Sequence, residues 1–209
     1  MRIDLQDPDP EKLRRAARIV RDGGVVLYPT DTIYGLGCDA LRPVSVQRLL
    51  AVKGRSGAKG MLVLIHSMEQ LQELAVGVSK EARSLLEHFW PGPLTVLFGA
   101  AREMPKDLQG DGGKLGVRWP ASGFLQRWLE LLRVPLVSTS ANRSGECYDG
   151  SPDVLRKLFG NRVDLFLDAG PLPASRPSTV LDASSQPFRI VREGENSDEV
   201  SRFLEIASE

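Results

Sequence analysis

Short apolar runs alternate with amphipathic segments along the chain, and this alternation restricts the fold more than any other feature of the sequence. Strands are predicted at residues 25–28, 61–65, 94–98, 115–119, 134–138, 163–167, 179–181 and 188–191. Helices are predicted to begin near residues 10, 43, 68, 79, 124, 152 and 197. Because no repeat and no Pro/Gly/Ser-rich linker separates these segments, the pattern indicates one α/β domain over residues 1–209. The close spacing of the last strands favours a mixed sheet flanked by helices.

Capping residues mark the ends of several predicted helices. Asp9 is a good N-cap acceptor, and Pro10 suits the first turn of the helix that follows. Gly54 is the expected C-cap of the second helix. Ser67 and Gln70 have the spacing of a capping box at the start of the third.

The composition is that of a globular protein with a substantial core. The chain has 209 residues, of which 42% are hydrophobic and 26% are charged. Its 27 Lys and Arg residues balance its 27 Asp and Glu residues, so the formal net charge is zero. These values exclude a disordered or fibrous chain. The longest apolar run, residues 61–65, is far too short to cross a membrane, so no membrane partner is expected.

Cysteine usage and the first residues indicate a reducing compartment. The two cysteines, Cys38 and Cys147, are too few for a disulfide framework. With only His66 and His88 beside them they make a poor zinc site, and no metal ligands are identified. Residues 1–6 contain no apolar stretch typical of a secretory signal, so a cytoplasmic location is expected.

The charges are distributed unevenly along the sequence. Residues 40–68 contain no acid but five cations, Arg42, Arg48, Lys53, Arg55 and Lys59. Residues 195–209, in contrast, form an acidic tail. A basic segment within a neutral protein indicates a local anion site rather than a general nucleic-acid surface. The alternative is a solvated helix face whose cations only complement a helix C-terminus.

The residue spacings in this sequence do not match those of familiar catalytic and nucleotide-binding motifs. Residues 35–40 match the letters of a dinucleotide-binding fingerprint, but the acid expected about 20 positions further on falls in the acid-free stretch. The phosphate-binding loop Gly-x-x-x-x-Gly-Lys-Ser/Thr does not occur. His66 lies at a predicted strand end and His88 in a predicted helix, where a structural role is more frequent than that of a catalytic base.

Four polar segments near the ends of predicted elements carry the candidate chemistry. They are residues 28–37, 53–60, 138–142 and 177–180. Hydroxyl groups just past a buried strand are typical of ligand sites in α/β proteins, although a turn with capping threonines is the alternative. The cations of residues 53–60 offer donors for phosphate oxygens. With Arg192, the four segments predict a site that positions a nucleotide and a small polar substrate without a nucleophile.

Lys53 and Arg55 lie two positions apart, so on a continuing helix their side chains would diverge by about 200°. Gly54 between them allows the helix to end at Lys53 and both cations to face one ligand. Both cations are expected to be exposed, to stabilise charge during catalysis and to contribute little to folding.

These motifs occur in a combination that resembles the YrdC/TsaC family of threonylcarbamoyl-AMP synthases. The shared segments, in chain order, are residues 28–38, Lys53-x-Arg55, and residues 90–95, 116–118, 138–142 and 177–180. The resemblance extends over residues 10–194. It implies a short, single-domain member with a twisted mixed α/β sheet and a concave, basic face.

The resemblance also implies a reaction and its partners. L-Threonine, bicarbonate and ATP would be joined into L-threonylcarbamoyladenylate, with release of pyrophosphate. ATP is then a substrate, and Mg²⁺ is expected on its phosphates. A separate tRNA threonylcarbamoyl transferase complex would transfer the product group to the adenosine beside the anticodon. Direct contact of this chain with tRNA, if any, is expected to be weak.

Individual site residues follow from the same resemblance. Its ATP-binding positions correspond to Lys53, Arg55, Lys59, Ser140, Asn142 and Arg192, of which Lys53 and Arg55 would be catalytic. Its L-threonine-binding positions correspond to Thr32, Arg118, Ser138 and Ser178. Arg118 would pair with the substrate carboxylate through its planar fork. The chain departs from many members at Ser56 and Gly60, where they have proline, and from longer members at Leu64, where they have histidine.

Three alternatives share the fold. An RNA-binding module would use the concave face, but the zero net charge and the acidic tail oppose strong non-specific binding. A YciO-like paralogue of unclear activity is opposed by the Lys-x-Arg and Ser-x-Asn pairs. The related domain of hydrogenase-maturation proteins belongs to longer chains with cysteine-rich zinc modules, which two cysteines cannot form.

Overall fold

The computed structural model describes residues 1–54, 61–143, 150–173 and 175–206. Its helices are α1 (Pro10–Arg21), α2 (Pro43–Lys53), α3 (Met68–Leu74), α4 (Lys80–Phe89), α5 (Gly123–Leu132), α6 (Pro152–Phe159) and α7 (Ser197–Ile206), with 3₁₀ turns at Lys106–Leu108 and Asp111–Gly113. Its strands are β1 (Val26–Tyr28), β2 (Gly35–Asp39), β3 (Leu62–Leu64), β4 (Ala75–Val76), β5 (Leu94–Ala100), β6 (Lys114–Arg118), β7 (Leu136–Ser140), β8 (Leu165–Phe166), β9 (Thr179–Asp182) and β10 (Arg189–Arg192).

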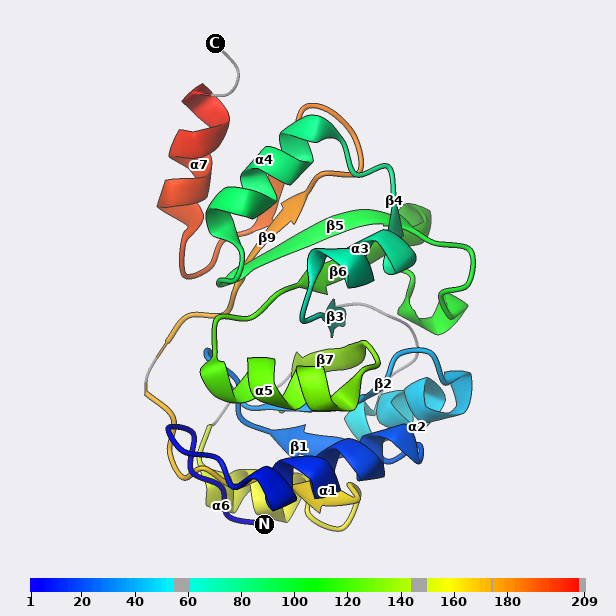
Figure 1. Cartoon of the computed structure of the whole chain (residues 1–209), viewed down its shortest axis with the longest axis vertical. Helices are drawn as coiled ribbons and strands as arrows, with labels where there is room; N and C mark the ends of the chain where they lie inside the picture. Colours follow the sequence, from blue (N-terminus) through cyan, green and yellow to red (C-terminus); the bar gives the residue numbers. More distant parts are fainter. Residues whose placement is uncertain (55–60, 144–149, 174, 207–209) are drawn as a thin grey trace.

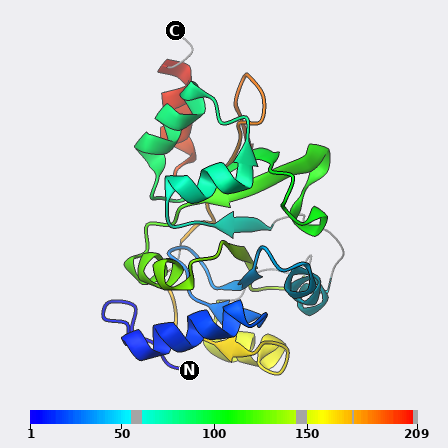
Figure 2. The same ribbon diagram turned by 45° about the vertical axis from the view of Figure 1, so that its right-hand side comes forward.

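Within the described residues, the ten strands form one sheet in the order β10-β9-β5-β6-β3-β7-β2-β1-β8, and β4 pairs with β5. The pairs β1/β8, β3/β6 and β5/β9 are parallel, and the remaining pairs are antiparallel. Helices α1 and α5 lie side by side toward one end of the molecule, and α4 and α7 lie at the other (Figure 1, Figure 2). The predicted mixed sheet flanked by helices is confirmed.

The predicted helix caps are present in the structure. The Asp9 carboxylate accepts a 2.8 Å hydrogen bond from a first-turn N–H of α1. Gly54 ends α2 in the left-handed conformation with φ 72°, which favours glycine. Ser67 accepts from the Gln70 N–H at 3.3 Å. The Gln70 side chain, however, accepts from the backbone of His66 instead of closing the capping box at Ser67.

Strand β2 was not predicted, because its two glycines interrupt the usual strand pattern. The strand is buried along its whole length and pairs antiparallel with both β1 and β7. A Cβ atom at Gly37 would lie 2.5 Å from the Val137 carbonyl oxygen and 2.8 Å from the Tyr28 ring. Close approach of its neighbours therefore requires glycine here. The fingerprint-like letters of residues 35–40 belong to a strand and not to a phosphate loop.

Strand β7 begins and ends two residues later than predicted. Its apolar run stops at Val137, but backbone pairing with β2 continues through Ser140. Ser138 therefore lies inside the strand, opposite Gly37 on one side and Leu62 on the other. The predicted polar segment of residues 138–142 is thus half strand and half turn, and the strand fixes the direction of its first hydroxyl groups.

Buried side chains form two apolar clusters. The smaller cluster packs α1 and α5 against β1, with Leu13, Tyr28 and Trp128 among its members. The Tyr28 and Trp128 rings meet edge to face, with centroids 5.2 Å apart. The larger cluster covers the rest of the sheet and includes Leu49 and Phe98. None of the described helices is long and apolar enough to cross a membrane.

Candidate functional site

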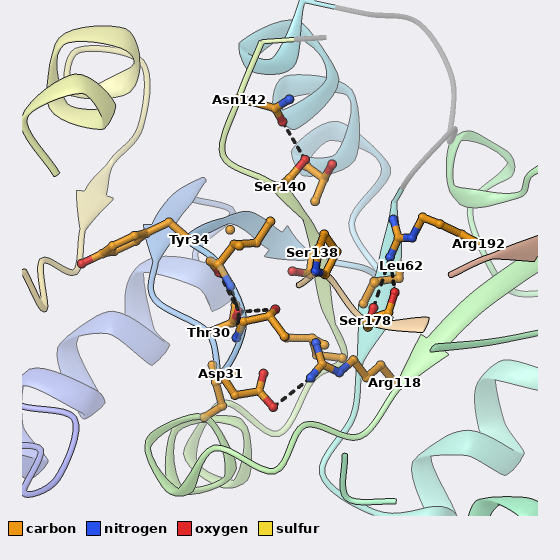
Figure 3. Close-up of a pocket in the computed structure, with 17 residues that line it drawn as sticks. Thr30, Asp31, Tyr34, Leu62, Arg118, Ser138, Ser140, Asn142, Ser178 and Arg192 are labelled. Carbon is orange, nitrogen blue, oxygen red and sulfur yellow. Dashed lines mark hydrogen bonds and ion pairs between the residues drawn. The ribbon is translucent and has the colours of Figure 1, made fainter. Parts of the chain in front are cut away.

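A pocket of about 270 Å³ opens where the middle of the sheet meets the turn after β1 (Figure 3). Seven predicted site residues line it, namely Thr32, Arg118, Ser138, Ser140, Asn142, Ser178 and Arg192. These residues come from the turn after β1, from the ends of β6 and β10, from β7 and the turn after it, and from the residue before β9. The sheet order therefore brings together the separate polar segments.

The turn between β1 and β2 is ordered by the hydroxyl group of Thr30. Its Oγ1 accepts hydrogen bonds from the N–H groups of Thr32 and Ile33, each at 3.1 Å, and contacts the Ile33 carbonyl oxygen at 2.6 Å. Thr32 is buried, and its Oγ1 lies 3.1 Å from that of Thr30. The Ser175 hydroxyl donates to the Thr32 carbonyl oxygen at 2.5 Å. These contacts hold the Thr32 side chain at the pocket wall.

Ser138 receives its orientation from Tyr28. The Tyr28 hydroxyl donates a 2.7 Å hydrogen bond to Ser138 Oγ in the buried interior. Burial raises the pKa of Tyr28, so the phenol stays protonated and remains a donor. Ser138 can therefore offer its own hydrogen to a ligand. Gly35 leaves room for this contact, because a Cβ atom there would lie 3.2 Å from Ser138 Oγ.

Arg118 is held in place at the end of β6 by two hydrogen bonds. Its Nε donates to the Gly92 carbonyl oxygen at 2.9 Å, and its Nη2 donates to Asp31 Oδ2 at 2.8 Å. The same Asp31 oxygen accepts from the Ala121 N–H at 3.2 Å. Burial lowers the pKa of Arg118, and the Asp31 charge opposes that effect. The predictions did not include Asp31, although a buried guanidinium requires a carboxylate partner.

Arg192 faces the same pocket from the end of β10. Its Nη2 donates to the Ser178 carbonyl oxygen at 2.7 Å and lies 3.3 Å from Ser178 Oγ, which in turn lies 2.9 Å from Thr95 Oγ1. Burial lowers the pKa of Arg192, and the nearby charge of Arg118 lowers it further. In the described part of the chain, no carboxylate forms an ion pair with Arg192. The pocket therefore has an excess of positive charge and favours an anionic ligand.

Lys53 ends α2 as predicted, but the expectation that it is exposed is wrong. Its side chain is buried, with 3% of the residue exposed. The ammonium group donates to the Ser140 carbonyl oxygen at 2.5 Å and to the carbonyl and side-chain oxygens of Asn142, each at 2.6 Å. These acceptors stabilise a buried cation. Lys53 therefore lies behind the pocket wall and fixes the turn that carries Ser140 and Asn142.

Five other positions complete the account of the residues that the sequence analysis discussed. Arg55 and Lys59 lie outside the described residues, as do Ser56 and Gly60. Leu64, which stands in place of a histidine in longer relatives, lines the pocket beside Leu62. The two leucines form an apolar wall next to the polar groups. Leu62 was not among the predicted residues, since an apolar strand residue shows no ligand-binding signal in the sequence.

The part of the chain that the structure describes contains no group of three or more His, Cys, Asp and Glu side chains placed to hold a metal ion. Asp31 is the one carboxylate among the described pocket residues, and Arg118 already occupies it. The described residues can hold a small anionic ligand through two guanidinium groups and several hydroxyl groups, beside an apolar wall.

Fold and site together define an α/β protein with a polar, positively charged pocket at the middle of a mixed sheet. A sequence model of the Sua5, YciO and YrdC proteins, described as telomere recombination, matches residues 18–194. The chain belongs to this Sua5/YciO/YrdC family, which confirms the resemblance seen in the motifs.

Curated relatives and a solved structure agree with this assignment. The threonylcarbamoyl-AMP synthase of Coxiella burnetii strain RSA 493 is 34% identical over 85% of this chain and 95% of its own length. That of Pyrococcus abyssi is also 34% identical, over 88% of this chain, which spans 54% of the Pyrococcus protein. The crystal structure of P. abyssi Sua5 complexed with L-threonine superimposes with a TM-score of 0.90 at 32% identity, covering 97% of this chain and 60% of that one.

Proposed function

We propose that this protein joins L-threonine, bicarbonate and ATP into L-threonylcarbamoyladenylate and releases pyrophosphate. The observation that carries the proposal is the pocket in which Arg118 and Arg192 face buried hydroxyl groups. The names of the Coxiella and Pyrococcus relatives support this activity. The threonine complex of P. abyssi Sua5 supports the identity of the smaller substrate.

L-Threonine occupies the end of the pocket formed by Arg118, Thr32 and Leu64. The Nε of Arg118 donates to the Gly92 carbonyl oxygen and one Nη2 hydrogen is donated to Asp31. The edge of the guanidinium that carries Nη1 therefore faces the substrate carboxylate. Thr32, with Ser138 and Ser178, holds the amino and hydroxyl groups. The methyl group packs against the leucine wall.

ATP extends past Ser140 and Asn142, which lie at the end of the pocket opposite Asp31 and Arg118 (Figure 3). At about 270 Å³ the pocket has room for a small substrate and for part of a nucleotide. Lys53 acts through Ser140 and Asn142, and Arg55 and Lys59 bind the triphosphate. Arg192 supplies a second guanidinium on this side. Mg²⁺ accompanies the phosphates, as it does in most ATP chemistry.

The reaction requires alignment and charge stabilisation but no covalent enzyme intermediate. The threonine amine adds to carbon dioxide derived from bicarbonate and forms a carbamate. A carbamate oxygen then bonds to the α-phosphorus of ATP, the bond from that phosphorus to the bridging oxygen breaks, and pyrophosphate leaves. The protein holds the two reactants in line and neutralises the developing negative charge. A separate transferase complex uses the product to modify the adenosine beside the tRNA anticodon.

Coupled pyrophosphate release tests the proposal. Purified protein is mixed with ATP, L-threonine and bicarbonate, and pyrophosphatase converts released pyrophosphate to phosphate for detection, while mass spectrometry identifies the adenylate. Release is expected only when all three substrates are present. L-Serine lacks the methyl group, so its kcat/KM should fall by about 10- to 200-fold. Equal release without threonine would leave a plain ATPase and overturn the proposal.

A further inference from the structure

The corner between β10 and α7, residues 193–197, packs directly against the segment that carries Ser178. A Cβ atom at Gly194 would lie 2.3 Å from the Thr179 nitrogen, and 2.4 Å from both the Pro177 carbonyl oxygen and the Ser178 carbonyl carbon. Gly194 is buried, and all three atoms belong to the backbone, so they cannot move aside as the end of a long side chain can. The two segments therefore meet backbone to backbone, and the contact requires glycine.

Glu195 fastens the corner to the residues just before Ser178. Its backbone N–H donates to the Pro177 carbonyl oxygen at 3.0 Å, and its carboxylate accepts from the Arg176 N–H at 2.9 Å. Glu195 is an exposed residue, so a change of its side chain leaves no buried cavity. The side-chain contact can therefore be removed with little effect on the core.

Ser197 fastens the corner from the buried side. Its Oγ accepts a 2.6 Å hydrogen bond from the Gly194 N–H and lies 3.2 Å from Thr179 Oγ1. Thr179 follows Ser178 and begins β9, while Ser197 begins α7, and both residues are buried. One hydroxyl group thus joins the start of α7 to the corner and to the strand beside Ser178.

Strand pairing alone does not fix the position of Arg192. Within the described sheet, β10 is an end strand and pairs only with β9. The register of this pair shifts between Ile190 and Arg192, and Val191 is exposed at the irregularity. Bulges of this kind redirect the side chains that follow them, and Arg192 lines the pocket. Its placement therefore depends on contacts beyond the strand.

The contacts that hold Arg192 in the described structure are with Ser178. Its Nη2 donates to the Ser178 carbonyl oxygen at 2.7 Å and lies 3.3 Å from Ser178 Oγ (Figure 3). The corner holds the chain on both sides of this contact, since it follows Arg192 directly and binds the residues that flank Ser178. A guanidinium group and a hydroxyl group from two segments are thus kept in one arrangement at the pocket.

We propose that Glu195 and Ser197 are positioning residues for substrate binding, and that they act by holding Arg192 against Ser178. The inference rests on the proposed function, in which Ser178 contacts threonine and Arg192 lies on the nucleotide side. Loss of either fastening shifts both groups, so the use of both substrates falls. A corner with a purely structural role would change the thermal midpoint and leave the kinetics of the folded enzyme unchanged.

Pyrophosphate release by Ser197 variants tests the proposal at a temperature where the variants are folded. Ser197→Ala should lower kcat/KM for threonine and for ATP by about 10- to 100-fold, because a misplacement of about 1 Å can cost two orders of magnitude. Ser197→Thr keeps the hydroxyl group and should recover most of the activity. The matched control, Ser79→Ala, removes the hydroxyl group that caps α4 at 3.2 Å from the Ala82 nitrogen, and both kcat/KM values should stay unchanged.

Glu195 variants test the same point without a change in the buried interior. Glu195→Ala removes the side-chain acceptor of the Arg176 N–H and should lower both kcat/KM values by about 3- to 30-fold. Its thermal midpoint should stay within about 2 °C of the unsubstituted protein, as expected for a surface substitution. Glu195→Gln keeps an acceptor oxygen and should be close to the unsubstituted protein in both measurements.

A double-substitution cycle shows whether Glu195 acts through Arg192. In an Arg192→Ala background, Glu195→Ala should cost little further activity, because the group that it positions is gone. An equal loss with and without Arg192, or normal kinetics in either the folded Ser197→Ala or the Glu195→Ala variant, would overturn the inference and leave the proposed function intact. An unsubstituted protein that makes no adenylate would overturn the proposed function, and this inference with it.

Discussion

Asp31 accepts a 2.8 Å ion-paired hydrogen bond from Arg118, although 87 positions separate the two residues in the chain. Asp31 lies in the turn after β1, and Arg118 ends β6. The pair therefore links two segments of the pocket wall. It also aims one edge of the guanidinium into the pocket, since the other edge is engaged with Asp31 and Gly92.

Asp31→Ala should impair threonine use through the loss of this orientation. A hydrogen bond to a charged group is worth about 1.5–3 kcal/mol, so kcat/KM for threonine should fall by about 10- to 150-fold. The KM for ATP should change little. Asp31→Asn keeps an acceptor oxygen for Arg118, so its kcat/KM for threonine should lie between that of the alanine variant and that of the unsubstituted protein. Tighter threonine binding by the alanine variant would show that Asp31 competes with the substrate carboxylate instead of orienting its partner.

Arg118→Lys should damage threonine use more than ATP use. Lysine keeps the charge but loses the hydrogen bond to Gly92 and the fork that grips a carboxylate. The expected cost is about 2–5 kcal/mol of threonine binding. Steady-state kinetics with each substrate varied in turn measures it. A normal KM for threonine combined with a raised KM for ATP would place Arg118 in the nucleotide subsite.

Lys53→Ala should lower both stability and turnover, because it removes the cation that donates to the carbonyl oxygens of Ser140 and Asn142 and holds their turn in place. Loss of the donor to partly buried neutral oxygens costs about 1–3 kcal/mol in the free energy of unfolding. For a chain of this size the thermal midpoint falls by about 2–4 °C per kcal/mol. The Arg55→Ala variant serves as the comparison. It should release pyrophosphate more slowly while its thermal midpoint stays unchanged. A Lys53 variant that folds normally would contradict the buried contacts.

Gly37→Ala should destabilise the fold, because the added methyl group would meet the Val137 carbonyl oxygen at 2.5 Å. Overpacking of this kind costs about 1–3 kcal/mol in the free energy of unfolding. Gly123→Ala is the matched control, since no atom lies within 4 Å of its added Cβ. Urea denaturation of the two variants measures the difference. Equal stability of both would argue against the tight packing of β2 on β7.

Asp168 should make stability depend on acid pH. Burial raises the pKa of this carboxyl, but the Gly170 N–H, Arg2 at 3.1 Å and Arg156 at 2.6 Å outweigh it, so the pKa is lowered. A lowered pKa means that the stabilisation is present above the unfolded value of about 3.9 and is lost as the pH falls through the folded value. Denaturation at a series of pH values measures this dependence.

Asp168→Asn should therefore cost about 1–3 kcal/mol at neutral pH. The difference from the unsubstituted protein should shrink in strong acid, where Asp168 itself is protonated. Glu103→Gln, at an exposed acid, is the control and should leave the profile unchanged. A constant difference across the acid range would mean that the substitution acts through packing and not through the charge.

The sequence predicted helix ends best, because a few residue types are strongly preferred as helix caps. Asp9, Gly54 and Ser67 act as the predicted caps, because capping depends on a few neighbouring atoms. Strand β2 was missed because Gly37 is required by the close approach of the Tyr28 ring on β1 and of the Val137 carbonyl oxygen on β7. Such long-range packing leaves no periodic signal.

Within the site, hydroxyl and guanidinium groups were predictable because they cluster in short polar segments. The partners that position them were not. Asp31 pairs with Arg118 and Tyr28 with Ser138 only after the sheet has formed. Lys53 was expected to be exposed, since cationic side chains are rarely buried, and only the fold shows that the end of β7 covers it. The roles in binding assigned to these residues remain predictions.

The parallel pairing of β5 with β9 has a consequence for the order of synthesis. Chains leave the ribosome from the N-terminus, so β5 emerges long before β9 and β10. During that interval residues 94–97 of β5 have one edge open to other chains, as an unpaired strand edge is, while β4 covers residues 99–100 of the same edge. The pocket also lacks Arg192 until β10 has emerged. A ligand that binds through both Arg118 and Arg192 can therefore stabilise only a chain that has been synthesised beyond β10. The same ligand does not stabilise a fragment that ends before β10.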